Sequence, residues 1–320
     1  MNRQRYLITN VVYGDLYSKI FLDQHLKSVL DPSNLPSVNE DYEIDYLIFT
    51  DEASKNRLEK DEQLNLLREF CGVEFKIFDE QANFDQRYSK ITQSFRETVK
   101  IAIKNKYDFV TAWVADLVVA KEFFPKILSH IARGHDSVFV LPMRTALEPM
   151  AETLNHKNEA MHCLELFKLG YENLHPLWVA CEWNNRRFTK HPFTLLWSNP
   201  NGTLARSFSI TPIIFKPNKK MILGRGMIDG DVPDTLSNPY WCENWEDAPV
   251  IGVEPLFCYY PTFSNNPPTV EFMRAWSRVS LEQSQISYLK HQLFYPNRDC
   301  FIEDQHLIGE SDTVVQAILN

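Results

Sequence analysis

The first 140 residues alternate short apolar runs with segments of helical periodicity. The apolar runs are rich in β-branched and aromatic residues and cover residues 5–12, 44–50, 73–78, 109–114 and 137–141. Segments with helical spacing lie between them at residues 17–30, 53–70, 84–106 and 122–133. Apolar runs of this kind are typical of strands buried on both faces. The alternation predicts an α/β fold with one mainly parallel, Rossmann-like sheet and helices on both faces.

The pattern loosens after residue 141. We predict helices over residues 146–155 and 158–169, strands over 208–215 and 250–258, and a helical C-terminal arm over 269–294. No linker-like composition and no internal repeat of 20 to 50 residues interrupts the chain. We therefore expect one continuous domain, with a βα half at residues 1–141 and an elaborated half at residues 142–320 that carries the arm.

Charge and cysteine content exclude several classes of protein. The chain has 33 Lys and Arg against 42 Asp and Glu, a formal net charge of −9, which disfavours binding to nucleic acid. The six cysteines contain no CxxC pair, so we expect reduced thiols in a cytoplasmic protein. Since no run approaches the roughly 20 apolar residues of a membrane span, we expect no transmembrane segment; contact with a membrane surface stays open.

The common motifs of parallel α/β enzymes are absent. Neither GxGxxG nor GxxxxGK[ST] occurs, which argues against a dinucleotide dehydrogenase or a P-loop enzyme. No GxSxG elbow is present either, so a hydrolase of that type is disfavoured. The ligand site must therefore be sought among other polar residues at the carboxyl ends of the strands.

Asp116 is the most informative such residue. It lies where the apolar segment of residues 107–119 is interrupted and the chain turns toward Lys121 and Glu122. An ionised carboxylate is costly in a core but can hold a divalent cation against phosphate oxygens at a strand end. A turn or helix-capping role for Asp116 is the alternative.

These segments resemble the GT-A fold of nucleotide-sugar glycosyltransferases. Residues 107–110 (Tyr-Asp-Phe-Val) resemble the start of the family strand that ends in a metal-binding Asp-x-Asp motif, and residues 114–116 occupy that motif. Val114 stands where the first aspartate is expected, so the resemblance carries over only Asp116. By the same resemblance, Asn10 belongs to the first strand and nucleotide loop, and Asp51 ends the second strand near the base and ribose.

A narrower resemblance is to a group of bacterial glycosyltransferase-like proteins. It is carried by residues 25–30 and 34–36, by Arg144 and Glu148 after the fifth strand, and by residues 208–213. Two histidines of the group's pattern are replaced here by Ser209 and Thr211. The resemblance implies that residues 1–141 bind the nucleotide and residues 142–320 face the acceptor.

Three further sets of residues are candidates on chemical grounds. Arg144 and Glu148 would share a face if their segment is helical, and Arg144 would suit a diphosphate or an anionic acceptor; a surface ion pair is the alternative. Asp229 and Asp231 flank Gly230 and could provide a general base or metal ligands, or an Asx turn.

The aromatic-rich stretch of residues 178–197 has the composition of a carbohydrate-contacting surface or of a core. The pairs His175-Pro176 and His191-Pro192 lack metal-ligand spacing and are expected to be structural.

Together these features predict a glycosyltransferase that moves a sugar from a nucleoside-diphosphate donor to a glycan, a lipid-linked glycan or another hydroxyl acceptor. Asn10, Asp51 and Asp116 would bind the donor, Asp116 with Mn²⁺ or Mg²⁺. Arg144 and Glu148 would contact the acceptor or a phosphate, and Asp229 and Asp231 would be catalytic. The alternatives are a noncatalytic sugar- or nucleotide-binding module on the same fold and, more distantly, a nucleotidyltransferase.

Overall fold

The computed structural model describes residues 3–78, 87–157, 159–222, 230, 232–258, 263–264, 266–296 and 304–320. The chain forms two compact units, each built from several segments. Unit 1 comprises Met1–Phe139, Thr153–His162 and Pro212–Tyr240, and unit 2 comprises Val140–Glu152, Cys163–Thr211 and Trp241–Asn320. No helix in the described part of the chain combines the length and apolar character needed to cross a membrane.

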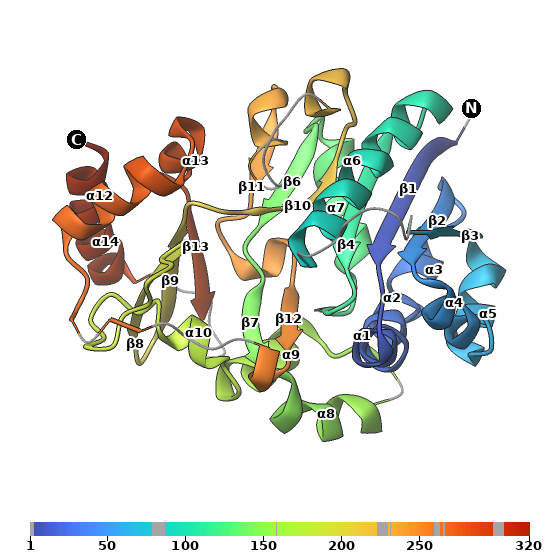
Figure 1. The fold of residues 1–320 in the computed structure, drawn as a ribbon, viewed down its shortest axis with the longest axis horizontal. Helices are drawn as coiled ribbons and strands as arrows, with labels where there is room; N and C mark the ends of the chain where they lie inside the picture. Colours follow the sequence, from blue (N-terminus) through green and yellow to red (C-terminus); the bar gives the residue numbers. More distant parts are fainter. Residues whose placement is uncertain are drawn as a thin grey trace. The chain divides into compact units, whose positions relative to one another are not determined.

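A seven-stranded sheet forms the centre of unit 1 (Figure 1). Its order is β11 (Pro239–Trp241), β6 (Ser137–Val140), β10 (Thr211–Phe215), β4 (Phe109–Val114), β1 (Gln4–Val11), β2 (Tyr42–Thr50) and β3 (Gly72–Ile77). β1 pairs in parallel with both β2 and β4, and β2 pairs in parallel with β3. All five predicted strands lie in this sheet, which confirms the α/β fold with a mainly parallel sheet.

The sheet departs from the simplest expectation beside β4. β10 pairs antiparallel with β4, through Phe215 and Val110, and separates β4 from β6. The strand predicted at residues 208–215 is therefore real but begins at Thr211. An antiparallel strand from late in the chain can occupy this place because pairing depends on apolar fit to the neighbouring strands and not on sequence order.

The described helices of unit 1 lie in the four predicted segments, apart from one short helix and two 3₁₀ turns. They are α1 (Asp15–Ile20), the π-helical segment η1 (Phe21–Leu26), α2 (Lys27–Val29), α3 (Leu35–Val38), α4 (Glu52–Leu58), α5 (Glu62–Phe70), α6 (Arg87–Asn105), α7 (Phe123–Ala132) and the short 3₁₀ turns η2 (Lys219–Ile222) and η3 (Pro233–Thr235). The helix predicted over residues 17–30 contains a π-helical turn. The helix predicted over 53–70 is two helices, because Asp61 caps α5 by accepting the Gln63 N–H.

Unit 2 contains a parallel strand pair and an antiparallel sheet. β7 (Met143–Ala146) pairs in parallel with β12 (Val250–Glu254), while β8 (Thr194–Asn199), β9 (Gly202–Ser207) and β13 (Gln292–Pro296) form the antiparallel sheet in the order β13-β9-β8. Its helices are α9 (Cys163–Glu172), α10 (Pro176–Val179), α12 (Val270–Ser280), α13 (Gln283–Tyr288), α14 (Gln305–Leu319), and the 3₁₀ turns η4 (Trp245–Asp247) and η5 (Leu256–Cys258). α8 (Leu147–His156) begins in unit 2, directly after β7.

Three predictions for the C-terminal half need correction. The helix predicted over residues 158–169 is α9, which begins only at Cys163 and continues to Glu172. The strand predicted over residues 250–258 ends at Glu254, because Pro255 follows and η5 begins at Leu256. The helical arm predicted over 269–294 ends at Tyr288, and the chain then enters β13. The segment 292–296 reads Gln-Leu-Phe-Tyr-Pro, and its apolar side chains are buried in the sheet.

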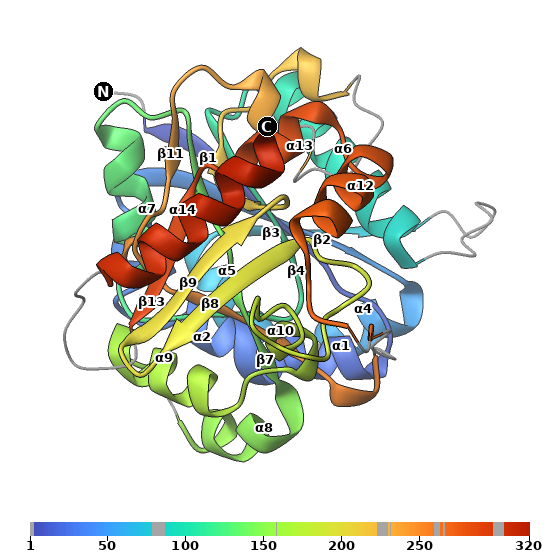
Figure 2. The same ribbon diagram turned by 90° about the vertical axis from the view of Figure 1, so that its left-hand side faces the viewer.

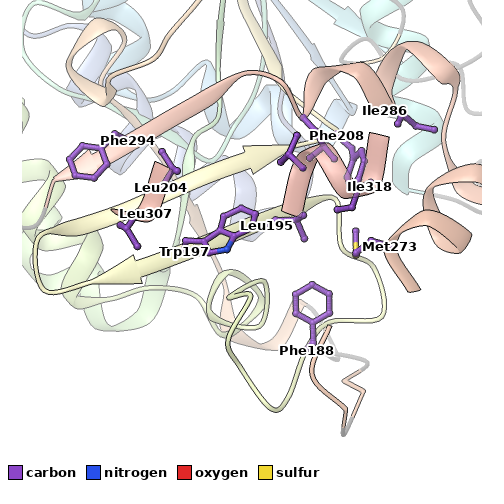
Figure 3. Packing of buried hydrophobic residues seen from close by; sticks show 12 residues of the cluster. Phe188, Leu195, Trp197, Leu204, Phe208, Met273, Ile286, Phe294, Leu307 and Ile318 are labelled. Carbon is purple, nitrogen blue, oxygen red and sulfur yellow. The ribbon is translucent and has the colours of Figure 1, made fainter. Parts of the chain in front are cut away.

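The core of unit 2 lies between the antiparallel sheet and the C-terminal helices. α14 crosses one face of β8 and β9 (Figure 2). Trp197 and Leu204 from the strands, Met273 from α12 and Ile318 from α14 are all buried in one apolar cluster (Figure 3). Burial of such side chains contributes roughly 1.5–3 kcal/mol each. α14 is therefore an integral part of the core of unit 2.

A buried arginine ties α14 to the same sheet. The Arg206 side chain in β9 is 3% exposed and donates hydrogen bonds to the Lys290 carbonyl (2.9 Å), Gln292 Oε1 (3.0 Å), Ser311 Oγ (3.3 Å from Nε) and Asp312 Oδ1 (2.5 Å). Burial lowers the Arg206 pKa, and the Asp312 carboxylate opposes that shift. A buried charge is tolerated here because its N–H groups are hydrogen-bonded on several sides.

We predict that Arg206→Ala lowers the free energy of unfolding by about 3 kcal/mol, because the Lys290 carbonyl and Ser311 hydroxyl lose their donor inside the protein. Asp312→Asn should cost about 1 kcal/mol, since the guanidinium keeps its neutral acceptors and Asp312 is 56% exposed. Urea denaturation of both variants measures the difference. Equal costs for the two variants would contradict the role assigned to Arg206.

Candidate functional site

Three predicted site residues of unit 1 lie at one edge of its sheet. Asn10 is near the carboxyl end of β1, Asp51 directly follows β2, and Asp116 lies two residues beyond β4. β2 and β4 are the two neighbours of β1, so their carboxyl ends are two strand spacings apart, about 10 Å. The fold therefore brings residues separated by 106 positions in the sequence to one edge, the usual ligand edge of a parallel sheet.

Asp51 joins the loop after β2 to the loop after β1. One of its carboxylate oxygens accepts the Ser54 N–H at 2.7 Å and caps α4, and the other is 3.4 Å from the Gly14 nitrogen. The Gly14 N–H also donates to Ser54 Oγ at 2.9 Å. Gly14 has a φ of 76°, a conformation that glycine adopts at little cost. Asp51 thus has a capping role, and its predicted contact with a donor stays a prediction.

Asp116 lies in a two-residue turn between β4 and β5 (Leu117–Val119). Ala115, its partner in the turn, is 1% exposed, whereas Asp116 is half-buried. The apolar segment is therefore interrupted at Asp116, as the sequence predicts. Val114, the last residue of β4, supplies no ligand atom from its side chain.

Asn10 is fully buried and fixes the start of this turn. Its Nδ2 donates to the Val114 carbonyl at 3.1 Å, and its Oδ1 accepts a hydrogen bond from the Tyr46 hydroxyl of β2. One amide in β1 thereby connects β4 and β2. With both amide atoms committed inside the protein, Asn10 orients the strand ends; direct contact with a ligand stays a prediction.

His25, in the π-helical segment, fixes the other end of the turn. Its Nδ1 donates to the Leu117 carbonyl at 2.7 Å, so the neutral ring carries its proton on Nδ1. Its Nε2 lies 3.2 Å from the Tyr46 hydroxyl oxygen. Burial lowers the His25 pKa to about 4, against a smaller effect of the Leu117 carbonyl. The carbonyls of Val114 and Leu117, on either side of Asp116, are thus both held by buried side chains.

The described residues provide limited means of holding a metal. They contain no group of three or more His, Cys, Asp or Glu side chains suited to a metal ion. Asp116 offers one carboxylate in the turn after β4, and Mg²⁺ is commonly held by one or two carboxylates together with substrate phosphates and water. The predicted Asp229 and Asp231 lie outside the described residues.

A second set of polar residues lies at the carboxyl ends of β7 and β12 in unit 2. Arg144 Nε is 3.3 Å from Glu254 Oε1, and Glu254 is the last residue of β12. Glu148, in the first turn of α8, accepts the Leu256 N–H at 3.0 and 3.2 Å with its two oxygens. The condition for a shared helix face of Arg144 and Glu148 is not met, because Arg144 belongs to β7 and helix α8 begins only at Leu147.

His175 belongs to the same cluster, although the sequence placed it among structural residues. Its backbone N–H donates to the Arg144 carbonyl at 3.0 Å, and its Nδ1 accepts the Leu177 N–H at 3.2 Å. The neutral ring therefore carries its proton on Nε2. Burial lowers the His175 pKa, Glu254 opposes that shift, and Arg144 adds to it. Only the strand pairing of unit 2 reveals this proximity, since His175 is 79 positions from Glu254.

The aromatic-rich stretch of residues 178–197 contributes mainly to the core. Trp178, Phe188 and Trp197 are 3% exposed or less, and Trp183 packs against the same apolar cluster. Phe193 is 43% exposed and packs edge-on against Trp276. Trp178, Phe188 and Trp197 therefore belong to the core and not to a carbohydrate-contacting surface, because a carbohydrate ring needs an accessible aromatic face.

Comparison with known proteins finds no protein-family model and no curated protein that matches the chain. Among solved structures, one match is the apo crystal structure of mouse xyloside xylosyltransferase 1, with a TM-score of 0.27 and 12% sequence identity. The match covers 44% of this chain, which spans 52% of that chain's length. Similarity at this level does not identify a shared function.

The buried His25 predicts a stability that depends on pH. Because the His25 pKa is lowered to about 4 in the folded protein, the unfolded chain binds more protons between about pH 6.5 and 4. His25 therefore stabilises the fold fully above pH 6.5, and this contribution is lost as the pH falls toward 4. Urea denaturation at pH 7, 6 and 5 should show a falling free energy of unfolding, and His25→Gln should flatten the fall.

His291→Gln is an independent second test, since the His291 pKa is also lowered to about 4 and its ring stacks on Trp241 in unit 2. The double variant should be flatter than either single variant. A His25→Gln protein with the same pH dependence as the wild type would show that His25 titrates normally in the folded state.

Proposed function

We propose that the chain is a glycosyltransferase that moves a sugar from a nucleoside-diphosphate donor to a glycan, a lipid-linked glycan or another hydroxyl acceptor. The observation that carries the proposal is the Asp116 turn, which lies at the carboxyl end of β4 and is held by Asn10 and His25. A carboxylate in a turn whose backbone is held at the ligand edge of a parallel sheet is suited to a charged, metal-associated ligand. The GT-A resemblance of the surrounding sequence adds the donor class.

In this proposal the donor binds at the carboxyl ends of β1, β2 and β4. Asp51 is proposed to contact the base and ribose, and Asn10 to orient the strand ends. A divalent cation, Mn²⁺ or Mg²⁺, when bound at Asp116 together with the diphosphate, would offset negative charge on the leaving group. The residues of the chain then have to orient the diphosphate and exclude water.

The acceptor side of the proposal rests on residues of unit 2 and on Asp229 and Asp231. Arg144 and Glu148 are proposed to contact the acceptor. Asp229 and Asp231 are proposed as the base that removes the acceptor hydroxyl proton, because a carboxylate can accept that proton as a general base.

A noncatalytic sugar- or nucleotide-binding module is the second candidate. Val114 favours it, because an apolar side chain stands at the position of the first motif aspartate. Such a module would bind the nucleotide sugar without transferring it. Transfer of the sugar to an acceptor separates the two candidates.

We expect a nucleotide sugar to raise the melting temperature of the wild-type protein, because a ligand that binds the folded state stabilises it by mass action. Thermal shift against UDP, GDP, CMP and dTDP sugars, with Mn²⁺ or with EDTA, identifies the donor and the need for metal. Asp116→Ala should abolish the shift and leave the melting temperature of the unliganded protein within about 2 °C, since the half-buried turn residue contributes little to the core.

Asp41→Ala is the control, because Asp41 is exposed and precedes the amino end of β2, the opposite edge of the sheet. It should respond to the donor like the wild type. A full donor response in Asp116→Ala would remove Asp116 from the donor site.

Once the donor is known, Asp229→Asn and Asp231→Asn test the base. The variant at the true base should bind donor normally and lose roughly 10²- to 10⁴-fold in transfer rate, the usual contribution of a general base. Radiolabelled sugar transfer to a panel of glycan acceptors measures the rate. Donor binding without transfer by the wild type on every acceptor would favour the binding module.

A further inference from the structure

The cluster of Arg144, Glu148, His175 and Glu254, here the β7–β12 cluster, contains a buried carboxylate oxygen that its ion pair does not use. Glu254 is 8% exposed, and its Oε1 pairs with Arg144 Nε at 3.3 Å. Its Oε2 is buried and accepts no hydrogen bond in the described structure. A buried carboxylate oxygen without a donor is unfavourable, so the arrangement is suited to a ligand that brings a donor to it.

The groups around Glu254 are held in place by the backbone. The Arg144 carbonyl accepts the His175 N–H at 3.0 Å, so the two residues lie side by side on neighbouring segments. Both oxygens of Glu148 accept the Leu256 N–H, which fixes the start of η5 two residues after Glu254. A site whose polar groups are fixed in advance loses less conformational entropy on binding.

The turn that Glu148 fixes presents the most exposed aromatic side chain of the described residues. Phe257 follows Leu256 directly and is 70% exposed. Leu256 itself is 44% exposed. An exposed ring three residues from a buried carboxylate combines an apolar face with polar acceptors, which are the two contacts that a pyranose ring needs for its C–H face and its hydroxyls.

The charge of the β7–β12 cluster selects the kind of ligand. Glu148 and Glu254 carry two negative charges against the single positive charge of Arg144, and His175 is kept neutral by burial. The net negative charge disfavours a phosphate or a sugar acid, whose oxygens would face carboxylates. It favours a neutral ligand whose hydroxyl groups donate hydrogen bonds.

We propose that the β7–β12 cluster binds a neutral glycan, with Glu254 Oε2 accepting a sugar hydroxyl, Arg144 donating to ring or hydroxyl oxygens, and Phe257 packing on the sugar face. The proposal rests on the proposed glycosyltransferase function and names its acceptor class. It also decides between the acceptor and phosphate roles that the sequence left open for Arg144 and Glu148.

The test is direct glycan binding by the full chain, without donor. Labelled wild-type protein is applied to an array of neutral and acidic oligosaccharides, and affinity for the best neutral glycan is then measured by calorimetry. Phe257→Ala should weaken binding about tenfold, since it removes an exposed stacking face without opening a cavity. Glu254→Gln should weaken it about 10- to 100-fold, since a charged acceptor is replaced by a neutral one.

Phe272→Ala is the matched control, because Phe272 lies on α12 of the same unit and is 38% exposed. It should bind the glycan like the wild type. The Phe257 variant keeps the test decisive even if Glu254→Gln fails to fold.

Three results would overturn the proposal: binding restricted to acidic glycans, no binding to any glycan on the array, or unchanged affinity in Phe257→Ala or in a folded Glu254→Gln. The thermal shift of Asp116→Ala with nucleotide sugars is independent of these residues. A protein that binds a nucleotide sugar but no neutral glycan would therefore retain the donor proposal and lose this one.

Discussion

The hydrogen bonds of the Asn10 side chain are the constraint on which the ligand edge of unit 1 depends. Asn10 is fully buried in β1, and its two amide atoms reach the strands on either side, Val114 of β4 and Tyr46 of β2. Tyr46 in turn lies against His25, which holds Leu117. The Asp116 turn is therefore fixed from both ends by a continuous chain of polar contacts inside an apolar core.

The hydrogen bonds among Asn10, Tyr46 and His25 share too few protons to satisfy every acceptor. The Tyr46 hydroxyl has one proton and two neighbours that accept it, Asn10 Oδ1 and His25 Nε2, because His25 Nδ1 already donates to Leu117. The contact with Asn10 is the shorter of the two. With His25 neutral, the contact between Tyr46 and His25 is therefore the weaker of the two. One hydroxyl proton cannot serve both acceptors at full strength.

The sequence predicts the parallel part of the sheet well, because buried strands are apolar throughout and their period differs from that of the helices between them. The insertion of β10 beside β4 and the strand at residues 292–296 are not predictable in this way, since both depend on partners far along the chain. The same limit applies to the candidate site. Asp116 is visible as a carboxylate that interrupts an apolar run, whereas His175 and Glu254 become neighbours only through the pairing of β7 with β12.

The interleaved course of the chain also explains why local patterns lose information after residue 141. Residues 153–162 and 212–240 belong to unit 1, although they come after the first segment of unit 2 in the sequence. β10 must fit between β4 and β6, which end at Val114 and Val140, 97 and 71 positions before β10 begins. Its five residues, Thr-Pro-Ile-Ile-Phe, carry the apolar character of a strand but no signal of its position in the sheet.

The buried Arg206 has a consequence for the order in which unit 2 can fold. Two of its acceptors, Ser311 Oγ and Asp312 Oδ1, belong to α14 and lie 105 and 106 positions after Arg206 in the sequence. Until α14 packs against the sheet, β9 carries a cation that the sheet alone cannot bury with full compensation. The final packing of β9 therefore waits for a contact between distant parts of the chain, which forms late because the entropy of closing a long loop must be overcome first. β8 and β9 are neighbours in the sequence, so they can pair before α14 arrives.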